Sequence, residues 1–105
     1  MEKEVIVSGK KFKGVKPRGG HASLRGYEIK LGEKTLVLIV GQKGYLACGY
    51  LNLEIADKFN DCCAIITGVN TVEEMLEKKV VSVSQKAKEV GINTGMTGKE
   101  ALQFI

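Results

Sequence analysis

The residue best suited to chemistry in this sequence is Cys48, which follows a short apolar segment and precedes Gly49. We expect residues 45–48 to form a strand and Asn52 to cap a following helix. A thiol beside a helix N-terminus feels the positive end of the helix dipole, which favours the reactive thiolate. Cys48 is therefore the candidate catalytic nucleophile. The competing interpretation is that Cys48 is a small buried side chain, the usual fate of a free cysteine.

A second group of residues could bind a small ligand next to Cys48. Residues 62–67 predict a buried strand, and the turn after it leads into a helix that Thr71 caps. If this strand ends beside the strand of residues 45–48, both turns face one crevice, where α/β sheets commonly bind ligands. An anion is the expected ligand class, because helix N-termini offer N–H donors. The Thr71 cap already uses some of these donors, so we favour a plain helix cap at this turn. The candidate ligand-binding residues are Lys43, Gly44, Tyr45, Gly49, Asn52, Gly68, Asn70 and Thr71.

Other residue types in the sequence indicate little chemistry. The single histidine, His21, lies among glycines, and no spacing pairs it with Cys48. Cys62 and Cys63 are adjacent, so in a strand they point to opposite faces, and we expect both in the core. No Cys-x-x-Cys or His-x-x-x-His pair is present, so we predict no metal site. The sequence indicates no particular cofactor.

Residues 10–25 form a basic segment that could meet an anionic partner such as a nucleic acid. They include six Lys and Arg residues and no Asp or Glu. Proteins that bind single strands normally interleave aromatic side chains, and Phe12 is the only aromatic residue of the segment. We therefore favour a solvated basic edge that keeps a sheet from pairing with foreign strands. Nucleic-acid binding through residues 10–25 remains an alternative.

The elements that position these residues indicate an α+β fold. Strand patterns dominate the first part of the chain, at residues 5–7, 24–31 and 35–40, with a hairpin tip at residues 32–33. Helix caps then mix with the strand of residues 62–67. We expect a mixed sheet packed against three to four short helices. The predicted helix caps are Asn52, Thr71, Ser82 and Thr97, with Gly91 ending the helix that Ser82 starts.

Length and composition indicate one globular domain. The 105 residues are 44% hydrophobic and 27% charged, an ordinary balance for such a domain. Residues 35–40 and 62–67 are apolar on both faces, which a few short helices cannot cover alone. We therefore expect self-association, with a second subunit covering the remaining face. The basic, β-rich residues 1–43 are the expected oligomerisation part, and residues 44–105 the mixed α/β part.

The chain has the features of a cytoplasmic protein. No apolar segment is long enough to span a bilayer, so we expect no membrane partner. The charged start of the chain does not resemble a signal peptide. Three cysteines, two of them adjacent, make a poor disulfide framework, which favours a reducing compartment.

Four segments together resemble a known family. They are GYLACGYL at residues 44–51, GVNTVEEML at 68–76, VGI at 90–92 and GMTGKEAL at 95–102. Their sequences and order resemble the YunC-like family, domain of unknown function 1805, from about Lys34 to the C-terminus but not over residues 8–28. The resemblance implies a small α+β domain whose N-terminal β region forms tetramers, and it implies no activity. Lys43 to Tyr45 and Cys48-Gly49 look like the family's signature.

The sequence thus predicts a small-ligand binding or assembly module with a crevice around residues 44–52 and 68–71. A thiol-dependent enzyme that uses Cys48 is the first alternative. Nucleic-acid binding through residues 10–25 is the second.

Overall fold

The computed structural model of the chain describes residues 24–105. The predicted strand at residues 5–7, His21, and all of the basic segment before Leu24 lie outside the described residues. In the described part, no helix is long and apolar enough to cross a membrane.

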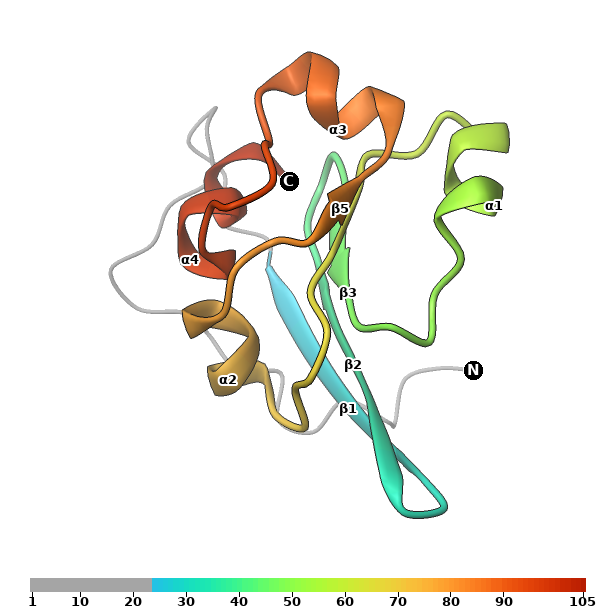
Figure 1. Ribbon diagram of the computed structural model, residues 1–105, viewed down its shortest axis with the longest axis vertical. Helices are drawn as coiled ribbons and strands as arrows, with labels where there is room; N and C mark the ends of the chain where they lie inside the picture. Colours follow the sequence, from blue (N-terminus) through green and yellow to red (C-terminus); the bar gives the residue numbers. More distant parts are fainter. Residues whose placement is uncertain (1–23) are drawn as a thin grey trace.

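A mixed sheet of five strands runs through the described chain (Figure 1). The strands β1 (Arg25–Leu31) and β2 (Lys34–Val40) form an antiparallel hairpin, and β2 pairs antiparallel with β3 (Tyr45–Ala47). Strand β3 runs parallel to β4 (Cys63–Ile65), which pairs antiparallel with β5 (Ser82–Val83). The fold is therefore α+β with a mixed sheet, as the sequence predicts.

Short helices lie on both sides of this sheet. In the view of Figure 1, α1 lies on one side, and α2 and α4 lie on the other. None of them exceeds six residues, so packing on the sheet has to stabilise them. The helices are α1 (Leu53–Lys58), α2 (Val72–Glu77), α3 (Gln85–Val90) and α4 (Gly98–Ala101), followed by the 3₁₀ turn η2 (Leu102–Phe104).

The buried side chains form two clusters, one on each face of the sheet. The larger cluster joins β2, β3 and β4 to α2, α3, α4 and η2, and the smaller one lies under α1. Strand alternation sends Cys62 to the larger cluster and Cys63 to the smaller one, which confirms that both are core residues. Helix α1 thus covers the second face over β4. The expected self-association stays a prediction. The largest fully buried side chains are Ile39, Leu46, Ile66, Met75, Ile92 and Leu102.

The helix predicted to start at Ser82 starts instead at Ser84. Ser82 pairs with Ile65 in the ladder between β4 and β5. It is therefore a strand residue and cannot cap the helix, although the local sequence pattern favoured that role. The Ser84 hydroxyl then caps α3 by accepting from Ala87 N–H at 3.2 Å. Gly91 ends α3 as predicted, with a φ of 115° that favours glycine.

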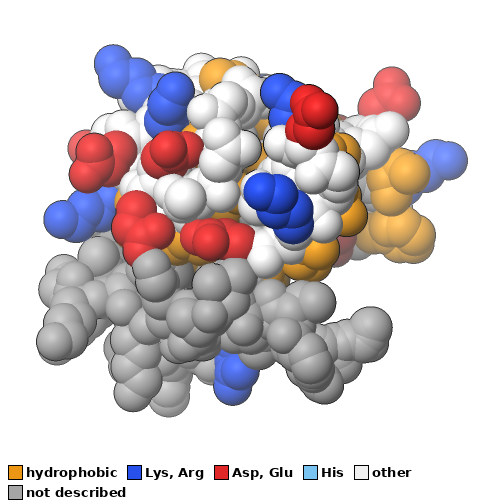
Figure 2. Space-filling view, turned by 90° about the horizontal axis from the view of Figure 1, so that it is seen from below, with side chains coloured by type: hydrophobic (Ala, Val, Ile, Leu, Met, Phe, Trp, Pro, Cys, Tyr) orange, Lys and Arg blue, Asp and Glu red, His pale blue; other side chains and the backbone are white. Residues whose placement is uncertain are grey.

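Helix α1 leaves apolar side chains on the surface. Its buried residue is Ala56, whereas the Ile55 and Phe59 side chains beside it are 51% and 73% exposed. Figure 2 shows hydrophobic side chains protruding at the α1 side of the molecule, next to charged ones. Among residues 24–105, Phe59 is the most exposed large hydrophobic side chain.

Candidate functional site

The carboxyl ends of β3 and β4 lie side by side, which is the arrangement that the predicted crevice requires. In the parallel pair, Ala47 is the partner of Ile65, and Ile66 N–H donates to the Ala47 carbonyl at 2.9 Å. A Cβ atom on Gly49 would lie 3.5 Å from Cγ2 of Thr67. The loop after β3 and the loop after β4 are therefore in contact.

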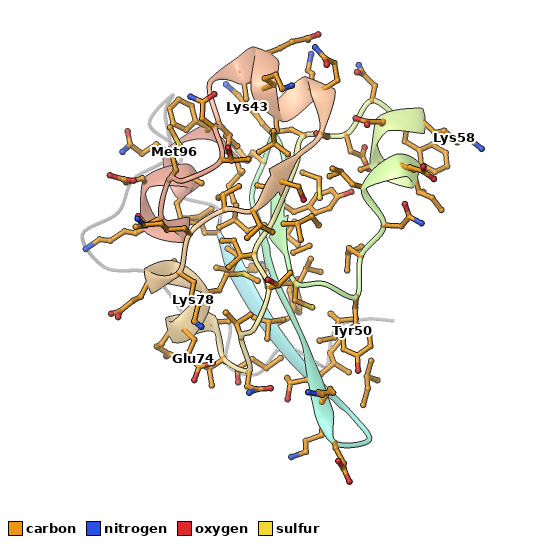
Figure 3. All side chains as sticks on the ribbon, in the orientation of Figure 1. Lys43, Tyr50, Lys58, Glu74, Lys78 and Met96 are labelled. Atoms are coloured by element: carbon orange, nitrogen blue, oxygen red, sulfur yellow. The ribbon has the colours of Figure 1, made fainter. Side chains whose placement is uncertain are left out.

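These two loops and the start of β2 line an open cavity of about 460 Å³, which we call the Cys48 cavity. Its walls are Lys34 and Thr35 from β2, residues 48–50, and residues 67–70. Figure 3 shows Tyr50 at the end of the molecule where the β1–β2 hairpin turns. A volume of this size falls within the range of sites for small molecules, which is roughly 300–1,000 Å³.

Cys48 lines this cavity although the residue is only 4% exposed. Its sulfur accepts a hydrogen bond from Val37 N–H at 3.3 Å, and its own N–H donates to the Val37 carbonyl at 3.1 Å. The Cys48 carbonyl turns away and accepts from Leu51 N–H at 3.1 Å. Cys48 is thus a buried residue with a structural contact, as the second interpretation of the sequence expects, and it is also part of the cavity wall. Its role as a nucleophile stays a prediction.

Two lysines give the cavity a positive side. Lys34 lines it, and Nζ of Lys78 would lie 3.7 Å from a Cβ atom on Gly68, another lining residue. Neither lysine forms an ion pair within residues 24–105. Figure 3 shows Lys78 at the C-terminal end of α2, where it caps the helix. The field of these ammonium groups favours an anionic ligand.

Backbone N–H groups at the N-terminus of α2 already donate hydrogen bonds to side-chain oxygen atoms of the protein. Glu28 of β1 accepts from Val72 N–H at 2.7 Å through Oε2, and Thr71 Oγ1 accepts from Glu74 N–H at 3.1 Å. Oε1 of Glu74 accepts from Asn70 N–H at 2.7 Å. The expectation of free N–H donors for an anion is therefore wrong here, and the plain helix cap is correct. No local pattern could reveal Glu28, because it reaches Val72 across 44 positions of sequence.

Asn52 and Thr71 are helix caps and do not line the cavity. Oδ1 of Asn52 accepts from Glu54 N–H at 2.8 Å and from Ile55 N–H at 3.3 Å, as its predicted cap role requires. Of the predicted ligand-binding residues, the cavity brings together Gly49, Gly68 and Asn70, with the thiol of Cys48.

Figure 3 shows Lys43 at the opposite end of the molecule from Tyr50. Gly44 and Tyr45 follow it directly in the chain. The three residues line a second hollow of about 270 Å³, formed by residues 40–45, residues 60–62 and Lys86, which we call the Lys43 hollow. A Cβ atom on Gly44 would lie 2.5 Å from the Cys62 carbonyl oxygen, so close packing explains the glycine. The predicted single crevice is therefore two separate hollows.

The side chains of the Lys43 hollow are held by burial and hydrogen bonds. The Tyr45 hydroxyl donates to Oδ2 of Asp61 at 2.9 Å. Burial, and next this hydrogen bond, raises the pKa of Tyr45 above its ordinary value. Burial also raises the pKa of the Cys62 thiol, although the Lys86 ammonium opposes that shift. These groups therefore stay protonated at neutral pH.

Within residues 24–105, no three His, Cys, Asp or Glu side chains are grouped so that they could hold a metal ion. The basic segment of residues 10–25 and His21 cannot be placed relative to either hollow, because all but the last two residues of that segment lie outside the described residues.

Comparison with known proteins places both cavity loops in a shared region. A model of the family described as Domain of unknown function (DUF1805) matches residues 47–105. The uncharacterized protein YunC of Bacillus subtilis (strain 168) is 30% identical over 78 residues, covering 70% of this chain and 77% of YunC. The crystal structure of a protein of unknown function, TA1206 from Thermoplasma acidophilum, is 42% identical, with a TM-score of 0.71. That similarity covers 73% of this chain and 76% of TA1206.

Proposed function

The chain belongs to the DUF1805 family, and from that premise we propose that it is a module that binds a small anionic ligand in the Cys48 cavity. The observation that carries the proposal is the cavity at the adjoining carboxyl ends of β3 and β4, with Lys34 and Lys78 beside it. Loops at such ends are where sheets with parallel strands commonly hold ligands.

The position of the family match supports this site. The match begins at Ala47 and so includes both loops of the cavity, residues 48–50 and 67–70. The Lys43 hollow is only partly included, because residues 40–45 precede the match. Lys34 and Thr35 of the Cys48 cavity also precede the match, so the support comes from its two loops.

A thermal-shift screen with small carboxylates and phosphate esters tests the proposal. A ligand that binds only the folded protein raises its melting temperature by mass action. Lys34→Gln removes one cation from the wall and should abolish the shift. Lys58→Gln removes a cation from α1, outside the cavity wall, and should leave the shift intact. If a ligand raises the melting temperature equally in the native chain, Lys34→Gln and Lys58→Gln, it does not bind in this cavity, and the result contradicts the proposal.

Thiol chemistry is a second candidate function, because Cys48 is one of the residues that line the cavity. Iodoacetamide labelling in a Cys62→Ala, Cys63→Ala background that folds normally separates the two functions. Rapid labelling of the folded protein would favour a nucleophilic Cys48, if the labelling rate increases with pH as a thiol is converted to its thiolate. Labelling only after unfolding would leave binding as the function of the cavity.

We also propose that the chain self-associates through the outer face of the β1–β2 hairpin. Tyr27, Ile29 and Leu31 alternate along β1 and so share one face, and Leu31 is 41% exposed. Tyr27 is the cross-strand partner of Leu38, which packs on the α1 side of the sheet. A second copy of the chain would bury this face.

Light scattering after gel filtration tests the assembly and its surface. The native chain should have the mass of an oligomer, with a tetramer as the expected state. Leu31→Lys should shift the mass toward the monomer, because it introduces an unpaired charge into a buried apolar contact. Phe59→Lys changes an apolar residue that is even more exposed, on α1, and should not alter the mass. A monomeric native chain would refute the proposal.

A further inference from the structure

The Lys43 hollow is built from three segments that the fold locks together. Gly41 N–H donates to the Gly44 carbonyl at 2.8 Å, and Lys43 N–H donates to the carbonyl of Ile105 at 2.7 Å. Gly44 lies directly on Cys62, where any side chain would collide. The hollow is therefore set by backbone contacts and does not depend on a bound ligand.

The charges of the hollow consist of two cations and one carboxylate. Lys43 comes from the turn between β2 and β3, and Lys86 comes from the first turn of α3. Neither forms an ion pair within residues 24–105, although Asp61 lines the same hollow. The two ammonium groups are thus available to an anion, with Asp61 as a third polar group.

The orientation of Asp61 is fixed. Its Oδ2 accepts from the Tyr45 hydroxyl at 2.9 Å, and its backbone carbonyl accepts from Oγ of Ser84 at 2.7 Å. Because Tyr45 keeps its proton, it remains a donor to this carboxylate at neutral pH. Oδ1 of Asp61 accepts no hydrogen bond from residues 24–105 and can accept one from a ligand.

We propose that the Lys43 hollow binds phosphate that retains a proton, with Lys43 and Lys86 on its charged oxygens and Asp61 accepting from its P–OH group. Lysine binds phosphate as a point charge, so two lysines favour a doubly charged anion over a carboxylate. The carboxylate of Asp61 repels any oxyanion that has no proton to donate. Phosphate and sulfate have the same shape, but only phosphate carries a proton at neutral pH.

The same argument separates inorganic phosphate from phosphate esters. A phosphate monoester loses its last proton near pH ~6, so it has no donor for Asp61 at neutral pH. Inorganic phosphate still carries one as hydrogen phosphate. The hollow, at about 270 Å³, is also smaller than the usual site for a drug-sized ligand. Inorganic phosphate is therefore the appropriate probe.

Isothermal titration of the full chain with inorganic phosphate, sulfate and methyl phosphate, at pH 7.5 and constant ionic strength, tests the proposal. We expect phosphate to bind roughly tenfold or more tightly than sulfate or methyl phosphate, because these two have no proton to donate to the Asp61 carboxylate and are repelled by it. Lys43→Gln with Lys86→Gln should weaken phosphate binding by at least roughly tenfold. Lys88→Gln, on the same helix but outside the hollow, should have no effect.

Asp61→Asn is the decisive variant, because asparagine can still accept from Tyr45 while losing the negative charge. It should strengthen sulfate binding and remove the preference for phosphate, with an unchanged melting temperature as evidence of folding. Equal affinity of the native chain for phosphate and sulfate would overturn the proposal. So would a preference that persists in Asp61→Asn, or an equal loss of phosphate binding in Lys88→Gln. The Cys48 cavity lies at the other end of the sheet, so these outcomes are independent of the proposed function.

Discussion

The backbone N–H of Val37 donates its hydrogen bond to the sulfur of Cys48, at 3.3 Å. Val37 and Cys48 lie opposite each other, one position beyond the Leu38–Ala47 pair of the antiparallel β2–β3 ladder. In a continuing ladder, the Cys48 carbonyl would accept from Val37 N–H. The chain turns after Cys48, so its carbonyl accepts from Leu51 and the thiol takes the vacated place. The side chain that could do chemistry in the cavity therefore also completes the sheet.

This contact predicts that Cys48→Ala destabilises the protein. The substitution leaves the fully buried Val37 N–H without an acceptor, which costs roughly 1–3 kcal/mol of unfolding free energy. Urea denaturation measures the loss. Cys48→Ser supplies an oxygen acceptor and should lose less than Cys48→Ala. If both variants lose the same amount, the hydrogen bond to sulfur contributes nothing.

Gly44→Ala should be far more costly than Gly49→Ala, although both glycines flank β3. A Cβ atom on Gly44 would lie 2.5 Å from the Cys62 carbonyl oxygen and 2.7 Å from its sulfur. On Gly49 the nearest such atom would be Thr67 Cγ2, at an ordinary 3.5 Å. We expect a loss of roughly 1–3 kcal/mol for Gly44→Ala and little change for Gly49→Ala in urea denaturation. Equal stability of the two variants would contradict this packing.

Ser84→Ala should destabilise the protein more than an exposed cap substitution. The fully buried Ser84 hydroxyl accepts from Cys63 N–H at 3.0 Å and from Ala87 N–H, and it donates to the Asp61 carbonyl. Its loss leaves the Cys63 N–H of β4 and the Asp61 carbonyl unpaired, which adds to the usual cap loss of about 1 kcal/mol. Thr97→Ala, at the exposed cap of α4, is the matched control for thermal denaturation. A smaller loss for Ser84→Ala would disprove this role.

The sequence predicted the fold well where local patterns decide it. Alternation located β1, and a run of apolar residues located β2. Hydroxyl caps located α2 and α4, with the full capping box of Thr97 and Glu100. It failed at Ser82, because pairing with Ile65 is a contact between distant residues. The same limitation hid Glu28 at the N-terminus of α2.

The candidate site was predicted only in part for a related reason. Lys43 and Cys48 are five positions apart, but β3 lies between them and carries them to opposite ends of the sheet. Proximity in sequence therefore suggested one crevice where there are two hollows. The pairing of Asp61 with Tyr45 depends on the contact between Gly44 and Cys62, which no periodic pattern encodes.

Three groups near β3 and β4 that are protonated at neutral pH make the free energy of unfolding vary with pH in the alkaline range. Burial raises the pKa of Cys63 to about 12, and it also raises the pKa of Cys62 and of Tyr45. In the unfolded chain these thiols titrate near pH ~8.5. The unfolded state therefore loses protons that the folded state keeps.

The consequence is that the protein loses stability as pH rises above the unfolded thiol pKa. The stabilising contribution of neutral Cys63 is fully present below about pH 8.5 and is lost as pH rises toward about 12. Urea midpoints measured from neutral pH upward should fall across this window. Cys63→Ala lowers the midpoint at every pH by removing core volume, but it should flatten the alkaline slope, because one titrating group is gone. A native slope that Cys63→Ala leaves unchanged would show that Cys63 ionises as easily folded as unfolded.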